Sequence, residues 1–182
     1  PDDHPQDGQA QARDGPRMSV LPIVKWPDPR LSQVCAPVET PANLADLVQD
    51  MFDTMYDAPG RGLAAPQVGV MQRLFVMDPT WKDGDRTPYV CINPEIVASG
   101  DTVAENTEAC LSIPGVSAGV IRPTEITLAY TDLDGTRHET HLTGFAATCA
   151  QHELDHLNGL VIFDRLSDAD RAQLETSYAA LA

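Results

Sequence analysis

Basic residues are scarce in this sequence. Twelve Lys and Arg residues stand against 27 Asp and Glu residues, and the formal charge is −15 at pH 7. Proteins that bind nucleic acid need a basic surface toward the phosphates, so this balance argues against such a function. Long apolar runs are missing too, since no stretch approaches the roughly 18 apolar residues of a membrane span. We therefore expect neither DNA nor a membrane among the partners.

Cysteine is used sparingly, and no two cysteines form a CxxC pair. The four are Cys35, Cys91, Cys110 and Cys149. Their wide spacing, in a chain without an apolar signal segment, argues against a disulfide framework. Free thiols are typical of a reducing compartment, so we expect a cytoplasmic protein. An isolated cysteine is most often a small buried hydrophobe, and we expect this of Cys35 and Cys91.

Large apolar residues are almost absent from residues 1–17, which are rich in Asp, Gln, Gly and Pro. A segment of this composition cannot bury enough surface to fold by itself. We expect it to be a disordered tail or a stretch foreign to the native protein. The chain of 182 residues otherwise suits one domain, so residues 18–182 are predicted to form a single domain.

Three helices are predicted in that domain. Thr40 can cap the first, and Pro41 suits its first position. The buried stripe of this helix would consist of Leu44, Leu47, Val48, Met51 and Met55. A second helix is predicted over 144–157 with Thr143 as its cap, and a third from Ser167, which begins a sequence similar to a capping box.

Between the helices lie β-rich runs at 73–77, 89–92 and 125–131. The turn residues at 132–135 predict a hairpin that joins 125–131 to 136–142. Strands that cluster together, with helices before and after them, indicate the α+β fold class.

The most specific local pattern is His152-Glu-Leu-Asp-His156 within the second predicted helix. Residues four apart share a helix face, so both imidazoles can bind one metal ion. Glu153 follows the first histidine, and its carboxylate can reach a water on that ion. A metal lowers the pKa of such a water, which suits hydrolysis. The pattern therefore predicts a metallohydrolase.

A catalytic metal site normally has three protein ligands and one open position. One class of HExxH enzymes places a third histidine six residues after the second, but that position is Ile162, which excludes the class. Another class uses a glutamate on a later helix, for which Glu175 is a candidate. The remaining candidate is a cysteine, Cys110.

A third segment, at 60–69, begins Gly60-Arg-Gly62 and continues through small apolar residues to Gln67. Glycines let backbone approach a ligand closely. The segment lacks the Gly-Lys-Ser/Thr of a nucleotide-binding loop. By itself it predicts no more than a tight turn.

Together these segments resemble the peptide deformylase family. Its signatures are Gly-x-Gly-Leu-Ala-Ala-Pro-Gln-x-Gly, Glu-Gly-Cys-Leu-Ser and Gln-His-Glu-x-Asp-His-Leu. The first is complete at 60–69 and the third at 151–157, whereas the second, at 108–112, has Ala109 in place of glycine. The resemblance covers about 18–167. It implies an α+β fold with small mixed or antiparallel sheets around a central metal-binding helix.

The resemblance further implies removal of the formyl group from the N-terminal formylmethionine of new polypeptides in the bacterial cytoplasm. Residues 18–182 would then be the catalytic domain, with N-formylmethionyl peptides as substrates. Cys110, His152 and His156 would hold one divalent metal ion per chain. Ferrous iron is the expected native ion, with zinc, nickel and cobalt as alternatives.

Three further residues would carry the reaction. Glu153 would take the proton of the attacking water and pass it to the leaving amine. The Gln67 side-chain amide and the Leu111 backbone N–H would stabilise the oxyanion. Asp155 would not touch the metal itself but would support the residues around it through a pair with Arg122.

The substrate would lie along the segments at 60–69 and 108–112 and along one face of the helix predicted over 144–157. Gly60, Arg61, Gly62 and Ala109 are expected to border its backbone.

Helical spacing from His152 places Phe145, Thr148 and Cys149 near the methionine side chain. A hydroxyl is unusual beside a thioether. Either the Thr148 hydroxyl bonds back to the Gly144 carbonyl, or the pocket is smaller or wetter than usual.

Three departures accompany the resemblance. Ala109 would crowd the substrate, or strain the backbone if its φ is positive. Many members carry a basic residue between Pro114 and Arg122, and this chain does not. The C-terminal helix is acidic, so any contact with the ribosome is expected to be transient and not through that helix.

Two other functions stay open. One is a non-catalytic or specialised deformylase-like paralogue. The other is a metalloprotease with Glu175 as third ligand, which would leave Cys110 and Gln67 without a role.

Overall fold

The computed structural model describes residues 18–182, so the expectation for residues 1–17 lies outside its range. With η denoting a 3-10 helix, the elements in chain order are η1 (Pro29–Ser32), η2 (Pro41–Leu44), α1 (Ala45–Asp57), β1 (Gly62–Ala64), η3 (Ala65–Val68), β2 (Leu74–Met77), β3 (Tyr89–Ser99), β4 (Val103–Cys110), β5 (Ile113–Pro123), β6 (Glu125–Thr131), β7 (Arg137–Thr143), α2 (Gly144–Leu157), η4 (Ile162–Arg165) and α3 (Asp168–Ala179). The fold is α+β, as predicted.

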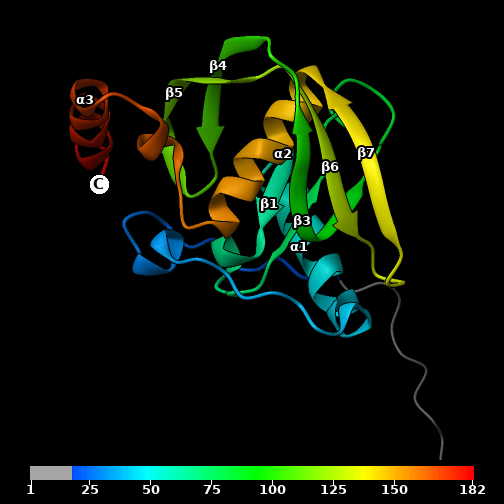
Figure 1. Cartoon of the computed structure of the whole chain (residues 1–182). Coiled ribbons are helices and arrows are strands. Elements are labelled where there is room, and N and C mark those ends of the chain that lie inside the picture. The colour runs from blue at the N-terminus through cyan, green and yellow to red at the C-terminus, as the bar shows by residue number, and fades with distance from the viewer. Residues whose placement is uncertain (1–17) are drawn as a thin grey trace, which may run out of the picture.

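Two antiparallel sheets flank the central helix α2. Five strands form one sheet in the order β1-β2-β3-β6-β7, and β4 pairs with β5 in a separate sheet. The helix lies between them (Figure 1), packing on β1, β2, β6 and β7 from one side and on β5 from the other. This confirms the expected arrangement of small antiparallel sheets around one helix.

The sequence of α2 explains its central place. Ala147, Ala150 and Leu157 are fully buried, and small side chains let both sheets approach the helix closely. They pack with Phe75 of β2 and Leu128 of β6 in one core cluster. Burial of a large side chain such as Phe75 contributes about 1.5–3 kcal/mol, so this packing holds the helix firmly.

The first predicted helix is present, but it starts later than expected. Thr40 makes no capping hydrogen bond, because Pro41 begins a 3-10 turn and the α-helix itself starts at Ala45. Thr143 also makes no side-chain capping bond. Ser167, by contrast, accepts a hydrogen bond from the Asp170 N–H, as predicted. The expected stripe of α1 is buried except for Leu47, which is only partly covered.

The hairpin of β4 and β5 was not among the predicted strands. Its first strand, Val103–Cys110, is mostly polar and exposed, and its pattern gives little signal of a strand. The pairing with β5 and a core cluster behind it stabilise the strand, and that cluster includes Ile113, Val120 and Phe163. This hairpin carries Cys110 to the face of α2. The predicted hairpin of β6 and β7 is confirmed.

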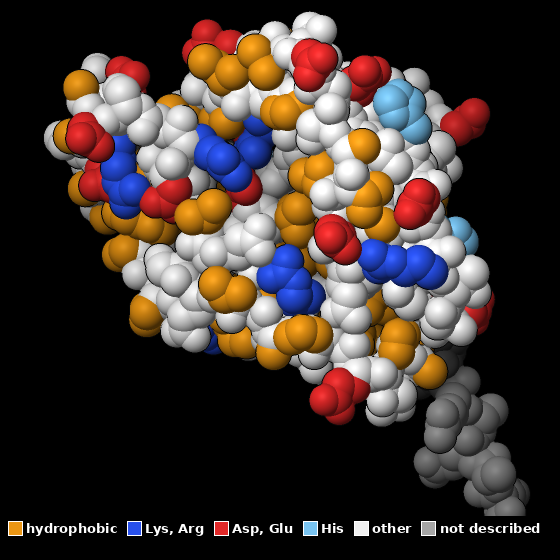
Figure 2. All heavy atoms as spheres, in the orientation of Figure 1, with side chains coloured by type: hydrophobic (Ala, Val, Ile, Leu, Met, Phe, Trp, Pro, Cys, Tyr) orange, Lys and Arg blue, Asp and Glu red, His pale blue; other side chains and the backbone are white. Residues whose placement is uncertain are grey.

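Charge is dispersed over the surface. Figure 2 shows Asp and Glu side chains spread over this face, with Lys and Arg only in small separate groups between them. No helix within residues 18–182 is both long enough and apolar enough to cross a membrane.

Candidate active site

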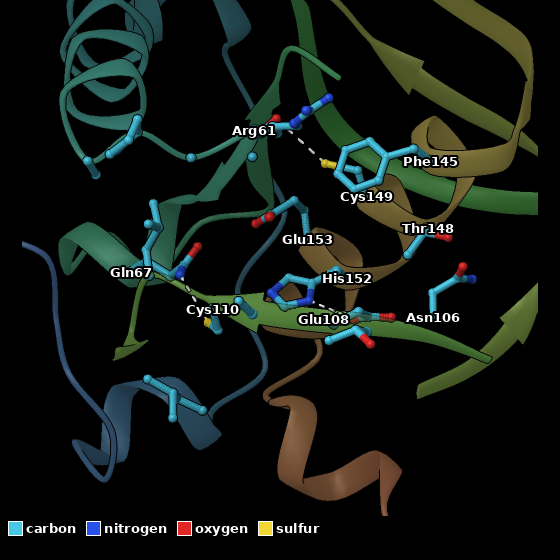
Figure 3. A pocket seen from close by; sticks show the side chains of 18 of the residues that line it. Arg61, Gln67, Asn106, Glu108, Cys110, Phe145, Thr148, Cys149, His152 and Glu153 are labelled. Carbon is cyan, nitrogen blue, oxygen red and sulfur yellow. Dashed lines mark hydrogen bonds and ion pairs between the residues drawn. The ribbon is translucent and has the colours of Figure 1, made fainter. Parts of the chain in front are cut away.

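A cleft of about 750 Å³ opens between α2, the β4–β5 hairpin and the loop before β1. Figure 3 shows side chains of α2 and of the hairpin directed into it, with Arg61 of the loop at its edge. The predicted site residues that line the cleft are Gly60, Arg61, Gly62, Gln67, Ala109, Cys110, Leu111, Phe145, Thr148, Cys149, His152 and Glu153. Segments far apart in the chain therefore meet in one cavity.

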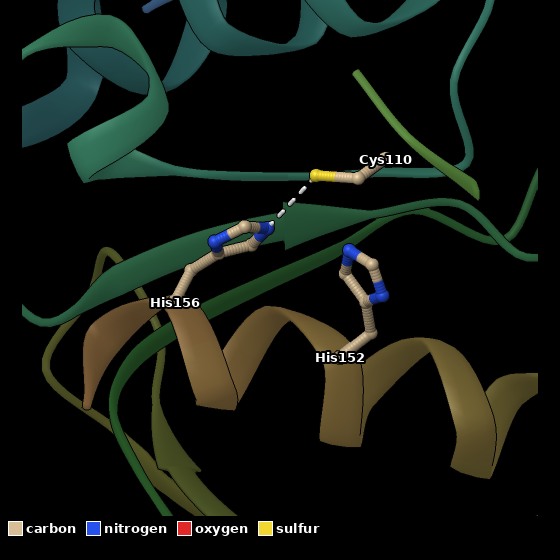
Figure 4. A group of neighbouring side chains, drawn as sticks. All are labelled: Cys110, His152 and His156. Atoms are coloured by element: carbon tan, nitrogen blue, oxygen red, sulfur yellow. Dashed lines mark hydrogen bonds between the residues drawn. The ribbon is translucent and has the colours of Figure 1, made fainter. Parts of the chain in front are cut away.

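One end of the cleft gathers three metal-ligating side chains. Cys110 of β4 faces His152 and His156 of α2, and their ligand atoms lie within 4.8 Å of one another (Figure 4). The Cys110 sulfur is 3.4 Å from Nε2 of His156, and both side chains are buried. One thiol and two imidazoles form a donor set that suits zinc, ferrous iron, nickel or cobalt. The residues present thus fit a divalent metal.

The charge state of Cys110 agrees with that use. Burial by itself would raise the pKa of its thiol. The charge of His156 and hydrogen bonds with His152 and His156 outweigh burial and hold the pKa well below its ordinary value. A thiolate is the form of cysteine that binds metal ions.

His152 is oriented by a carboxylate behind it. Its Nδ1 lies 2.8 Å from Oε1 of Glu108, and Figure 4 shows its other nitrogen facing Cys110. Arg122 holds Glu108 in a bidentate pair, with its Nε 2.7 Å from Oε2. Arg122 also donates to Asp155 at 3.0 Å, which is the pairing expected from the sequence. These buried charges form one connected network.

Gln67 presents its amide N–H group toward Cys110. Its oxygen accepts from the Ala64 N–H at 2.9 Å. Its nitrogen donates to the Ser112 hydroxyl at 3.0 Å and lies 3.6 Å from the Cys110 sulfur. The side chain is buried, so these bonds fix which end of the amide faces the metal-ligating group.

Glu153 lies beside this group with unused hydrogen-bonding capacity. It is buried, and its Oε2 has no partner among residues 18–182. Burial raises the pKa of its carboxyl above the ordinary value, although His152 and His156 act in the opposite direction. A Cβ at Gly62 would lie 2.8 Å from its carboxyl carbon, so only glycine lets the carboxyl sit there.

Ala109 causes no backbone strain. Asn93 is the only non-glycine residue with positive φ in the described part of the chain, and Ala109 pairs with Ser117 in β4. The strain considered from the sequence is therefore absent. Ala109 lines the cleft, so we still expect its methyl group to crowd the substrate.

Glu175 lies away from the metal-ligating group. It is on α3, where its carboxylate is 2.6 Å from Nε of Arg171, and the group at the cleft forms without it.

Sequence reasoning assigned no role to several residues around the cleft. Glu108 could have been found, because residues two apart on a strand share a face and Cys110 lies two residues further on. Ser112 belongs to the motif at 108–112 but was given no role of its own, and Asn106 and Lys25 carried no local signal. The Lys25 ammonium donates to the Leu111 carbonyl at 2.8 Å, across 86 positions of sequence.

Comparison with known proteins identifies the family. The family model for polypeptide deformylase matches residues 20–172. The peptide deformylase of Rhizobium meliloti (strain 1021) is 46% identical over 155 residues, which are 85% of this chain and 89% of that protein. That of Zymomonas mobilis is 46% identical over 162 residues, 86% of this chain and 92% of the other.

Solved structures are similar as well. A plant peptide deformylase superposes with a TM-score of 0.83 at 38% identity, covering 88% of each chain. The Ehrlichia chaffeensis enzyme in complex with actinonin gives 0.82 at 40% identity, over 89% of this chain and 98% of the other. The similarity extends over nearly the whole of the compared proteins, and this chain belongs to the peptide deformylase family.

Proposed function

We propose that this enzyme hydrolyses the formyl group from the N-terminal formylmethionine of new polypeptides and releases formate. The observation that carries the proposal is the position of Glu153. Its unpartnered carboxylate oxygen lies in a cleft directly beside three side chains suited to one metal ion.

Cys110, His152 and His156 would hold that ion, with ferrous iron as the proposed native metal and zinc, nickel or cobalt as substitutes. A divalent ion there supplies Lewis acidity and lowers the pKa of a water. Glu108 fixes the His152 ring, Arg122 holds Glu108 in turn, and Asp155 accepts a hydrogen bond from Arg122. Such outer contacts normally tune both ligand geometry and affinity.

The protein's own groups then move the proton and stabilise charge. Glu153 accepts a proton from water as the water oxygen attacks the formyl carbon. The oxyanion that forms is met by the Gln67 amide and the Leu111 N–H, each such donor being worth about 3 kcal/mol. Glu153 returns the proton to the leaving nitrogen, the C–N bond breaks, and formate and a free amine result.

The substrate would lie along the walls of the cleft. Gly60 and Gly62 leave room beside Leu111 and Glu153, because a Cβ at either would overlap those side chains. The Ala109 methyl would border the peptide backbone.

The pocket for the first side chain would be lined by Phe145, Thr148 and Cys149. Arg61 closes its rim, since its guanidinium lies 4.9 Å from the Phe145 ring centre and donates to the Asp83 carboxylate at 2.7 Å.

The rival functions are less well supported. A metalloprotease with Glu175 as ligand would need that side chain at the cleft, but it is paired with Arg171 on α3. A non-catalytic paralogue would be expected to lose a ligand or Glu153, and all are retained.

The partners follow from the reaction. N-formylmethionyl peptides would be met in the bacterial cytoplasm, and the curated relatives compared above are bacterial. Any encounter with the ribosome would be transient. Helix α3 would not mediate it, because it carries Asp168, Asp170 and Glu175 against a single Arg171.

Formate release decides the proposal. Protein purified without oxygen should contain about one divalent ion per chain and hydrolyse formyl-Met-Ala-Ser. Cys110→Ser should lose both metal and activity. A fully metal-loaded protein that releases no formate would overturn the proposal.

A further inference from the structure

The hydroxyl of Thr148 is left without a partner inside the protein. Thr148 lies on α2, one turn before His152, with only 7% of its surface exposed. Its hydroxyl forms no hydrogen bond within residues 18–182, although three other helical hydroxyls bond to the carbonyl four residues earlier. Those belong to Thr54, Thr176 and Ser177.

Thr148 lies one turn after the start of the helix. The carbonyl four residues before Thr148 belongs to Gly144, which starts the helix with φ of 56°. The back-bond from Thr148 to the Gly144 carbonyl, which was considered from the sequence, is not formed. The hydroxyl also keeps some contact with the cavity. Within residues 18–182 the fully enclosed side-chain polar atoms without a partner are Glu153 Oε2 and His156 Nδ1, and the Thr148 oxygen is not among them.

A second free polar group faces the same space. Asn106 lies on β4 two residues before Glu108, so the two share a strand face. Its amide forms no hydrogen bond within residues 18–182, and it lines the cleft together with Thr148, at the cleft's solvent-exposed edge. Figure 3 shows both residues at the end of the cleft beyond His152, opposite to Gln67.

Three other polar groups that line the cleft are already engaged. Arg61 donates to the Pro79 carbonyl and to Asp83. The Cys149 thiol donates to the Arg61 carbonyl at 3.6 Å, and the Thr124 hydroxyl to Thr102 at 3.2 Å. A side chain that enters beside Phe145 therefore meets two polar groups without a partner in the described chain.

From this arrangement we infer that the pocket selects formyl peptides whose first side chain has about the length of methionine and ends in a hydrogen-bonding oxygen. Methionine sulfoxide is the matching case, and the Thr148 hydroxyl and the Asn106 amide would donate to its oxygen. A bare thioether would displace water from these two donors without replacing its hydrogen bonds, which costs binding energy. The inference rests on the proposed function and specifies its substrate class.

The test compares three peptides on the metal-loaded enzyme. Formyl-Met(O)-Ala-Ser carries the oxygen, formyl-Met-Ala-Ser the thioether, and formyl-norleucyl-Ala-Ser an apolar chain of the same length. We expect kcat/KM for the sulfoxide to equal or exceed that for the other two. Thr148→Val keeps the shape and removes the hydroxyl, so the sulfoxide-to-norleucine ratio should fall about 3- to 10-fold, the scale of one hydrogen bond.

Matched variants separate the hydroxyl from packing. Thr148→Ser keeps the hydroxyl and should preserve the ratio, whereas Asn106→Leu should lower it as Thr148→Val does. An unchanged ratio in Thr148→Val, or a higher kcat/KM of the wild type for norleucine than for the sulfoxide, would overturn the inference while the proposed function stands. Failure to hydrolyse any of the three peptides would overturn both.

Discussion

The carboxylate of Glu108 lies 2.8 Å from Nδ1 of His152, and this contact decides which nitrogen of the imidazole is available to a metal. Because Nδ1 is engaged by Glu108, Nε2 is the ring nitrogen that faces Cys110 and is left to bind a metal. Burial opposes a charged imidazole, but hydrogen bonds with Cys110 and Glu108 raise the pKa of His152 well above its ordinary value. Arg122 keeps Glu108 in place through a pair that is almost completely buried.

Replacing Glu108→Gln should weaken metal binding by about 10- to 100-fold, because the amide holds the His152 ring less strongly and leaves Arg122 less well paired. Competition with a chelator measures this directly. Glu105→Gln is the matched control, since Glu105 is exposed on the same strand. Equal metal retention by both variants would contradict a role for Glu108.

Replacing Glu153→Ala should leave the fold and the metal intact and lower turnover by at least about 10²-fold, the usual scale for a general acid/base. Formate release and elemental analysis of the same sample provide the two measurements. Glu175→Ala serves as the control and should retain near-native rates. Should Glu175→Ala lose its metal instead, the ligand set proposed here is wrong.

Replacing Gly62→Ala should lower turnover at least about tenfold while metal content is retained, since the new Cβ would overlap the Glu153 carboxyl and displace it. Gly100→Ala places its Cβ against the exposed side chain of Glu125, which can move aside, and should keep activity. Normal kinetics in Gly62→Ala would show that the carboxyl has more freedom than its burial implies.

The pH dependence of kcat/KM should show an acid limb above the ordinary carboxyl pKa. Burial raises the pKa of Glu153, and the carboxylate is the form that accepts a proton, so activity is lost as pH falls through this raised value. Rates on formyl-Met-Ala-Ser across the acidic and neutral range, with metal content checked at each pH, test this. An acid limb below the ordinary value would contradict it.

Several features of this protein could be inferred from sequence because they depend on short stretches of chain. Two histidines four apart on one helix must share a face, and Glu153 beside them follows from the same periodicity. The order of the three motifs indicated the family, and the core stripe of α1 followed from its spacing. The polar strand β4 was not predicted, because its stability comes from pairing with β5 and not from its own residues.

The remaining features depended on contacts between distant segments, which no local pattern encodes. The bond from Glu108 to His152, the orientation of Gln67 by Ser112, and the space that Gly62 leaves for Glu153 all join separate elements. Caps at Thr40 and Thr143 were predicted from residue type and are absent. Residue type shows only which hydrogen bonds a side chain can form, and the surrounding backbone and packing decide which of them it makes.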